Sequence, residues 1–159
     1  MDKDAQTISS PQDYVFLTLT TYRKRNVFIN DPICEALCEA MTFHMKSGHV
    51  ELAGFVIMPD HVHFLIRPRD WTISDFVNNF KTYTGIKVKS IGRFSRKVWR
   101  RRFYDIPMDS PADFRKKLDN MHNNPLAKKI AAKPHEYPWS SAANYFGWPG
   151  TVPVTIARF

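Results

Sequence analysis

The sequence predicts an α+β fold, a sandwich in which an antiparallel sheet carries helices on one face. Segments that alternate apolar and polar residues recur along the chain, and stretches with apolar residues at helical spacing separate them. The resulting order is strand, helix, strand, strand, helix, strand, helix, with a polar C-terminal extension. Short strands interrupted by two crossover helices are typical of a ferredoxin-like sandwich.

The first strand and the first helix are the clearest elements of the pattern. Residues 14–22, YVFLTLTTY, alternate and are rich in β-branched and aromatic side chains, as expected of a strand. Asp31 and Pro32 then form a helix start, with a cap and a first-turn proline. The apolar residues that follow are at helical spacing and predict a helix to about Lys46, which Gly48 ends.

A pair of strands and a second helix follow. Residues 49–57 and 61–67 read as two strands joined by a turn that contains a proline, and they are expected to form a hairpin. Residues 71–89 carry apolar side chains at i, i+3, i+4 and i+7, which predicts a helix. Either Thr72 or Ser74 can cap its first turn.

The last strand and helix are predicted from a short apolar run and a strong start signal. Residues 98–106 predict a short strand. Ser110, Pro111 and Asp113 then supply a cap, a first-turn proline and an acid at the third helical position. We expect Pro125 to stop this helix, because the residue before a proline is pushed away from helical angles.

The length of the chain suits one domain. We expect a polar N-terminal arm over 1–13, a folded domain over 14–146 and a C-terminal tail over 147–159. The N-terminus is polar and unlike a signal peptide, and no apolar run approaches the roughly 18 residues of a membrane span. These features predict a cytoplasmic protein.

Positive charge is concentrated in residues 87–102. The chain holds 23 Lys and Arg against 15 Asp and Glu, and this segment alone accounts for the formal net charge of +8. Its cations are Lys87, Lys89, Arg93, Arg96, Lys97, Arg100, Arg101 and Arg102. Phe94, Trp99 and Phe103 are interleaved with them, which suits base stacking beside phosphate contacts. We therefore predict a nucleic acid as partner; a membrane is disfavoured because no strongly amphipathic helix accompanies the charges.

Two histidines flank a single valine at the start of the predicted third strand. Residues two apart in a strand point to the same face, so His61 and His63 present two imidazoles side by side, whereas Val62 and Phe64 face the other way. Neutral imidazole is the commonest metal-ligating side chain. Asp60 can accept a proton from one imidazole and fix its tautomer, or it is simply a turn residue. The pair alone is weak evidence for a metal.

Four motifs, the first of which contains the histidine pair, make the pattern specific. The runs FVIMPDHVHFLIRP, VWRRRFYD, DFRKKLDNMHNNPLAKK and PHEYPWSSAANY occur in this order. Together they resemble the single-tyrosine HUH transposases, in which HUH denotes histidine, a bulky hydrophobic residue and histidine, and in particular the REP-associated branch. The resemblance extends from about Tyr14 to about Tyr145. It implies a ferredoxin-like fold and a metal-dependent nuclease that acts on single-stranded DNA at hairpin-forming sequences.

The resemblance also implies a site and a reaction. A divalent ion, Mg²⁺ or Mn²⁺, would be held by His61, His63 and a third polar side chain that falls at Asn124. The ion would polarise the scissile phosphate. In the family, a tyrosine on the last helix attacks this phosphate, forms a 5′-phosphotyrosine and frees a 3′-hydroxyl, and rejoining reverses the step. The position of that tyrosine is occupied by Asn120.

Asn120 leaves the activity open. An asparagine has no hydroxyl, so the chain is either a nuclease that uses another group or a hairpin-binding protein that does not cut. Tyr104 is a weak substitute nucleophile, since a packed aromatic on a strand is its simpler interpretation. The asparagine is also consistent with an engineered or a sporadic loss in an otherwise active lineage, or with a phosphodiesterase that uses water.

The neighbouring His122 is not expected to ligate the metal. It lies roughly 200° around the helix from Asn120 and from Asn124. We expect a structural hydrogen bond, a phosphate contact or no role for it. The predicted partner is thus single-stranded or hairpin DNA, bound by a monomer or a homodimer.

Overall fold

The computed structural model describes residues 13–158, so the predicted N-terminal arm lies outside the described residues except for Asp13. Four strands form one antiparallel sheet in the order β2-β3-β1-β4. The strands are β1 (Val15–Thr20), β2 (Val50–Met58), β3 (His61–Pro68) and β4 (Tyr104–Pro107). The helices are α1 (Asp31–Lys46), α2 (Ile73–Gly92), α3 (Pro111–Ala127) and α4 (Ala142–Phe146), with short 3-10 turns η3 (Tyr22–Lys24) and η4 (Pro134–Glu136). This arrangement confirms the predicted α+β fold class.

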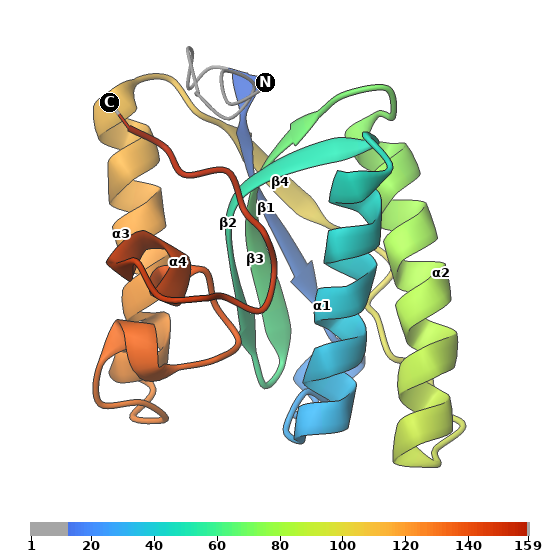
Figure 1. The fold of residues 1–159 in the computed structure, drawn as a ribbon. Helices are drawn as coiled ribbons and strands as arrows, with labels where there is room; N and C mark the ends of the chain where they lie inside the picture. Colours follow the sequence, from blue (N-terminus) through green and yellow to red (C-terminus); the bar gives the residue numbers. More distant parts are fainter. Residues whose placement is uncertain (1–12, 159) are drawn as a thin grey trace.

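Helices cover both faces of the sheet (Figure 1). On one face, α1 and α2 pack around Leu17, Phe64 and Phe80. On the other face, Phe114 and Met121 of α3 pack against the sheet, and α4 lies beside them. The sequence predicts helices on one face only. The third helix lies on the opposite face because all nine residues of β2 are buried, so this strand needs apolar partners on both sides.

The three long helices begin at side-chain caps. The side chain of Asn30, one residue before the predicted start, accepts a hydrogen bond from the Ile33 amide at 3.0 Å. Thr72 forms a reciprocal capping box with Asp75, and Ser110 caps α3 as predicted. Local sequence therefore determines where these helices start.

The outer edge of β2 is covered by the C-terminal part of the chain. The Ile57 amide donates to the Trp139 carbonyl at 2.8 Å, and the Thr155 amide donates to the Leu52 carbonyl at 2.8 Å. Val152 is buried in the core. These bonds satisfy backbone groups that an edge strand would otherwise leave exposed.

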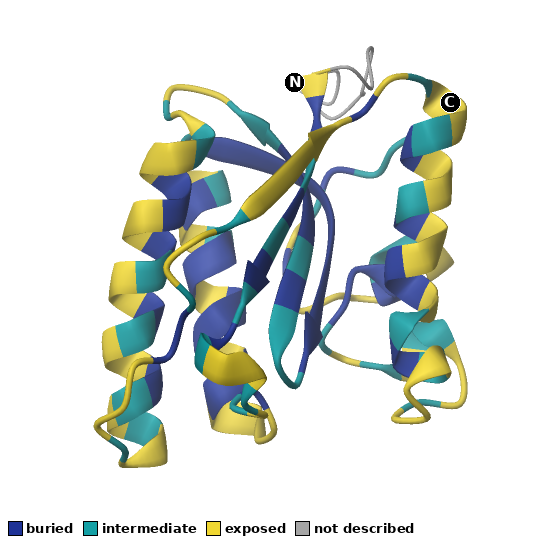
Figure 2. Ribbon diagram, turned by 180° about the vertical axis from the view of Figure 1, so that it is seen from behind, coloured by how far each residue is buried: buried dark blue, intermediate teal, exposed yellow. Residues whose placement is uncertain are grey.

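The opposite edge strand, β4, is shorter than predicted and lies open to solvent. The strand expected over 98–106 is found only at Tyr104–Pro107, and Trp99 forms an isolated bridge with Thr21. In the intervening segment, the Lys81 ammonium donates to the carbonyls of residues 100, 101 and 102, at 2.7, 3.4 and 3.2 Å, so these groups are paired with α2 and not with a strand. All four residues of β4 are exposed (Figure 2).

The proline in α3 does not end the helix where expected. Pro125 lies inside α3, which continues to Ala127. The last turn is held by the Lys128 amide, which donates to the Asn124 carbonyl at 3.1 Å, and by the Ile130 amide, which donates to the Pro125 carbonyl at 2.9 Å. Pro125 is buried, and its packing compensates for the missing backbone donor.

The described helices are those of a globular domain. α2 is the longest, with 20 residues, and its outer side carries polar and charged residues together with the exposed Tyr83 and Ile86. Within residues 13–158, no helix has the length and apolar character that crossing a membrane requires. The cytoplasmic location stays a prediction.

Candidate metal and nucleic-acid site

His61 and His63 lie on the α3 side of the sheet. His63 pairs in register with Val56, which packs against α3, whereas Val62 and Phe64 belong to the core on the other face. The centroids of the two imidazole rings are 4.5 Å apart. The two rings are therefore close enough for their nitrogens to share one ligand.

Each imidazole is held through the same ring nitrogen. Nδ1 of His61 lies 2.7 Å from Oδ1 of Asp60, and Nδ1 of His63 lies 3.0 Å from the hydroxyl of Thr18. Among the described residues, nothing hydrogen-bonds to either Nε2. Because the carboxylate of Asp60 accepts a proton from Nδ1, it leaves the Nε2 lone pair of His61 available to a metal ion.

The environment of His63 keeps its ring neutral. Burial, together with the neighbouring His61, lowers the pKa of His63 to about 3, and Lys117 acts in the same direction. A neutral imidazole is the form that ligates metals. His63 is thus competent as a ligand at physiological pH.

The hairpin turn that carries His61 is anchored by the loop after β1. The carbonyl of Pro59 accepts from the amides of Val27 and Phe28, at 2.9 and 3.0 Å. The carbonyl of Asp60 accepts from the amide of Thr21 at 2.9 Å and from its hydroxyl at 3.1 Å. These bonds hold the first histidine rigidly relative to the sheet.

One stripe of α3 faces the histidines. The Lys117 ammonium lies 5.5 Å from the centroid of the Phe16 ring, and Phe16 stacks on His63 with centroids 4.8 Å apart. Asn120 and Asn124 follow Lys117 at i+3 and i+7, so they lie on the same side of the helix. Asn120 is exposed and Asn124 is half-buried.

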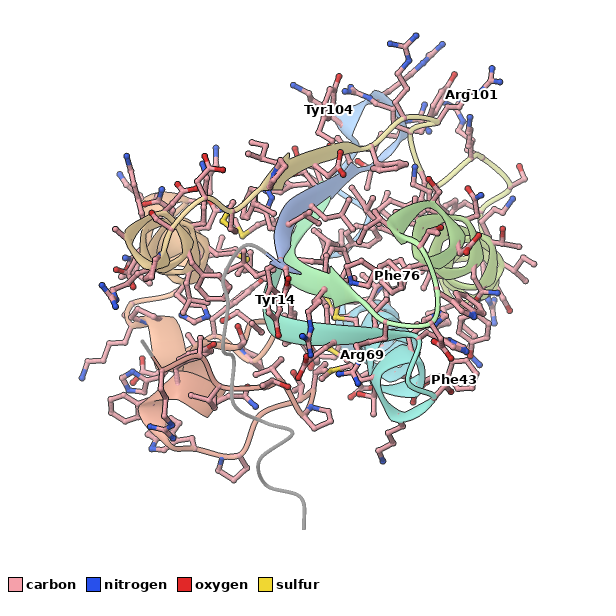
Figure 3. All side chains as sticks on the ribbon, turned by 90° about the horizontal axis from the view of Figure 1, so that it is seen from above. Tyr14, Phe43, Arg69, Phe76, Arg101 and Tyr104 are labelled. Atoms are coloured by element: carbon pink, nitrogen blue, oxygen red, sulfur yellow. The ribbon has the colours of Figure 1, made fainter. Side chains whose placement is uncertain are left out.

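The basic segment joins the sheet next to this site. The Arg100 amide donates to the carbonyl of Thr20 at 2.9 Å, and Thr20 pairs in register with His61. A hollow of about 350 Å³ lies between α2 and the segment. The cations that line it are Lys81, Lys89, Lys97, Arg100 and Arg101. In the view down the strands, Arg101 lies at the same edge of the molecule as Tyr104, far from Arg69 (Figure 3).

A comparison with protein families decides the classification of this chain. The family described as Transposase IS200 like matches residues 10–109. The chain belongs to this family. The match covers β1 to β4 and includes both histidines, but it ends before α3, so Asn120 and Asn124 lie outside it.

Two solved structures share the fold of this IS200-like chain. A REP-associated tyrosine transposase bound to a REP hairpin is 18% identical, with a TM-score of 0.70, and the similarity covers 94% of this chain and 88% of that one. A candidate transposase from Deinococcus radiodurans R1 is 19% identical, with a TM-score of 0.51, covering 68% of this chain and 89% of that one. No curated protein sequence matches. The predicted family is confirmed, and the likeness to the two structures is one of fold.

The donor set of this IS200-like site fits a divalent ion. Within residues 13–158, no group of three or more His, Cys, Asp or Glu side chains is placed to hold a metal. His61, His63 and the amide oxygen of Asn124 would supply two nitrogens and one oxygen. Mg²⁺ and Mn²⁺ take about six ligands and usually keep several waters, so a partial protein set leaves room for phosphate oxygens.

His122 faces away from the histidine pair. Its Nε2 lies 2.7 Å from the hydroxyl of Ser141, and the same hydroxyl accepts from the Phe55 amide at 3.0 Å. Burial lowers the pKa of His122 to about 4. Of the roles considered from the sequence, the structural hydrogen bond is the one the structure shows.

Several residues around the site were not identified from the sequence. Thr18, Phe16 and Lys117 contact the histidines or one another, and Lys81 shapes the basic segment. Each is separated from its partner by many positions in the chain. The alternation of residues 14–22 indicates the face of Thr18 but not its partner, because strand register is set by tertiary pairing.

Proposed function

We propose that this protein binds hairpin-forming single-stranded DNA and holds a divalent ion, Mg²⁺ or Mn²⁺, at His61, His63 and Asn124. The observation that carries the proposal is the pair of imidazoles on one sheet face, each tied through Nδ1 and free at Nε2. The adjacent segment 87–102 would bind the DNA backbone through its cations. That a protein of the same fold was solved bound to a REP hairpin supports the choice of a hairpin as ligand.

The ion would act on the DNA phosphate. Bound between the two imidazoles and Asn124, it would polarise a phosphoryl oxygen and orient the backbone. The contribution of the protein is to present neutral imidazoles in a fixed orientation. Asp60 and Thr18 supply that orientation.

The protein is proposed to bind without forming a covalent intermediate at position 120. Asn120 lies on the stripe of α3 that begins at Lys117 and is exposed, which supports its assignment to the nucleophile position of the family. An amide has no hydroxyl oxygen to form a phosphodiester with DNA. Retention of the ion site without the nucleophile favours recognition over cleavage.

Strand cleavage and joining is the second candidate function. Tyr104 pairs in register with Thr18, the residue that contacts His63, so it projects from the same sheet face as the histidines. It is exposed and carries the hydroxyl that Asn120 lacks. This placement is the reason to test it as a nucleophile.

One set of assays separates these functions. Binding of a labelled hairpin oligonucleotide with an unpaired extension is measured with Mn²⁺, and covalent adducts are sought on a denaturing gel. We expect the native chain to bind without an adduct and Asn120→Tyr to form one. His61→Ala with His63→Ala should abolish the effect of Mn²⁺ on binding.

Each contrary outcome has a definite meaning. If the native chain does not bind the hairpin, the proposal fails. An adduct formed by the native chain and lost in Tyr104→Phe would establish cleavage by Tyr104. Shortened products without an adduct would point to hydrolysis by water.

A further inference from the structure

Strands β1 and β4 leave part of the α3-side sheet face open. Phe16 pairs in register with Ile106, and Thr18 with Tyr104, so these four side chains share the face that carries His63. Phe16 and Thr18 are half-buried, but Tyr104 is 59% and Ile106 is 49% exposed. α3 packs over β2 and reaches the β1 side at Tyr14 and Phe16, so the exposed part of the face is that of β4. We call these four residues the sheet platform.

We propose that the sheet platform stacks an unpaired base of a DNA strand, with Tyr104 as the stacking ring. This inference rests on the proposed function and names how the single-stranded part of the ligand is held. Phe16 and Tyr104 are diagonal neighbours on adjacent strands, roughly 7–8 Å apart. His63 stacks on Phe16 and the Lys117 ammonium lies over the same ring, so Tyr104 is the platform ring left free for a base.

The charges around the platform favour a polyanion as its occupant. The Lys117 ammonium lies over the Phe16 ring at 5.5 Å. Arg101 and Arg102 are exposed immediately before β4, and Figure 3 shows Arg101 and Tyr104 at the same edge of the molecule. Exposed aromatic rings bordered by cations are the combination that binds single-stranded nucleic acid, because every base has a face that can stack.

The sheet itself is suited to this use. RNA-recognition modules stack two or three bases on aromatic side chains of a four-stranded sheet. Here Phe16 already stacks on His63, with centroids 4.8 Å apart. A base held on Tyr104, whose register partner Thr18 contacts His63, would bring its backbone towards the two imidazoles. The platform would thereby deliver a phosphate to the proposed ion site.

A second copy of the chain is the competing occupant, because β4 is an open edge strand. Backbone pairing with another β4 would use the amides of this strand. Pro107 has no amide hydrogen, and β4 is only four residues long, so such pairing would be short. The charges around the platform favour DNA instead, and the experiment distinguishes the two.

The test compares three ligands and three variants. The ligands are a hairpin with an unpaired extension that contains 2-aminopurine, the same hairpin without the extension, and oligothymidylate. The variants are Tyr104→Ala, Tyr104→Phe and the control Tyr83→Ala, which removes a 46% exposed tyrosine from α2 on the other face. Affinity is measured by fluorescence anisotropy, and melting temperature confirms that each variant folds.

Stacking predicts a specific pattern of affinities. Tyr104→Ala should weaken binding of the extended hairpin and of oligothymidylate by roughly 5- to 150-fold, the range expected for one stacked base. It should change the affinity for the blunt hairpin, which lacks the extension, by less than about twofold. It should also remove the quenching of 2-aminopurine fluorescence. Tyr104→Phe and Tyr83→Ala should bind as the native chain does, because both keep the ring at position 104.

Other outcomes refute stacking by Tyr104, or refute hairpin binding while leaving the stacking inference intact. Equal affinities for Tyr104→Ala and the native chain, or equal losses for blunt and extended hairpins, would refute stacking. A loss in Tyr104→Phe as large as in Tyr104→Ala would assign the effect to the hydroxyl. A change in oligomeric state in place of DNA affinity would assign β4 to self-association. If oligothymidylate binding depends on Tyr104 but no hairpin binds, the platform stands and hairpin recognition fails.

Discussion

The hydroxyl of Thr18 lies 3.0 Å from Nδ1 of His63, although 45 positions separate the two residues in the chain. The contact crosses from β1 to β3, whose register places the two residues opposite one another. It gives the inner histidine an orienting partner equivalent to Asp60 beside His61. In each ring, the neighbour that contacts Nδ1 leaves Nε2 as the nitrogen available to a metal ion. Neither Thr18 nor Asp60 is itself a proposed metal ligand.

Removing the Thr18 hydroxyl should weaken metal binding. Thr18→Val keeps the size and the β-branched shape but leaves Nδ1 of His63 without its partner. We expect the affinity for Mn²⁺ to fall by roughly 10- to 100-fold, the usual cost of losing a residue that orients a ligand. Isothermal titration calorimetry with Mn²⁺ measures the change.

The matched control is Thr20→Val, two residues along the same strand and face. Thr20 lies opposite His61, and its hydroxyl has no hydrogen bond within the described residues. Its substitution should leave Mn²⁺ affinity within about twofold of the native value. Equal losses in the two variants would show that the hydroxyl of Thr18 does not orient His63.

Removing the Lys81 ammonium should disorder the basic segment. Lys81→Met keeps the length of the side chain but withdraws the donor from the carbonyls of residues 100–102. Burial lowers the pKa of Lys81 to about 8, so the ammonium already bears a desolvation cost that these carbonyls offset. We expect faster hydrogen exchange over 98–103 and weaker DNA binding, both measurable on the isolated protein.

Lys87→Met provides the comparison, because Lys87 is exposed on the same helix. If Lys87 contacts one phosphate, its loss should reduce the slope of log affinity against log salt by about 0.7. Lys81→Met should reduce it by more, since it displaces several arginines together. A smaller reduction for Lys81→Met than for Lys87→Met would contradict the proposed role of Lys81.

Adding a methyl group at Gly54 should destabilise the fold. A Cβ at this position would lie 2.8 Å from Cδ1 of Leu118 and 2.9 Å from Cε of Met121, so these buried side chains of α3 would have to shift. We expect Gly54→Ala to lower the free energy of unfolding by about 1–3 kcal/mol, the range for overpacking a core. Urea denaturation measures it. Gly85→Ala is the control, since its nearest neighbour is at 3.9 Å and alanine favours a helix interior.

Stability should fall in mild acid, in part through His44. Nδ1 of this buried residue lies 2.9 Å from Nδ1 of His49, and Glu39 lines the adjoining cavity. Burial first, and then His49, lower the pKa of His44 from 6.5 to about 4. The unfolded chain therefore takes up this proton first as pH falls. The contribution of neutral His44 to the free energy of unfolding is complete above pH 6.5 and is lost as pH falls towards 4.

Urea unfolding of the native chain and of His44→Leu at pH 7 and pH 5 tests this assignment. One proton contributes at most about 1.4 kcal/mol per pH unit to the slope. The native chain should lose more stability than the variant between the two pH values. Parallel losses would mean that the titration of His44 does not contribute.

The helices were predictable because their signals are local. The cap at Ser110 and the capping box at Thr72 each act within one turn, so they can be read from a few adjacent letters. The end of α3 was not predictable in the same way. Pro125 stays within the helix because it is buried against other elements, which the local rule for proline does not include. The segment before β4 likewise has a partner that local sequence does not reveal, because Lys81 of α2 donates to the Arg100 carbonyl.

The sequence by itself determined the order of the elements, the shared face of His61 and His63, the local charge excess and the family. These properties follow from periods of two and 3.6 residues and from motifs of a few letters. Only the tertiary structure decided that α3 covers the second sheet face, that Thr18 contacts His63, and that Tyr104 lies on the face of the histidines. Such relationships depend on strand register and on packing between distant segments, and no short stretch of sequence encodes either.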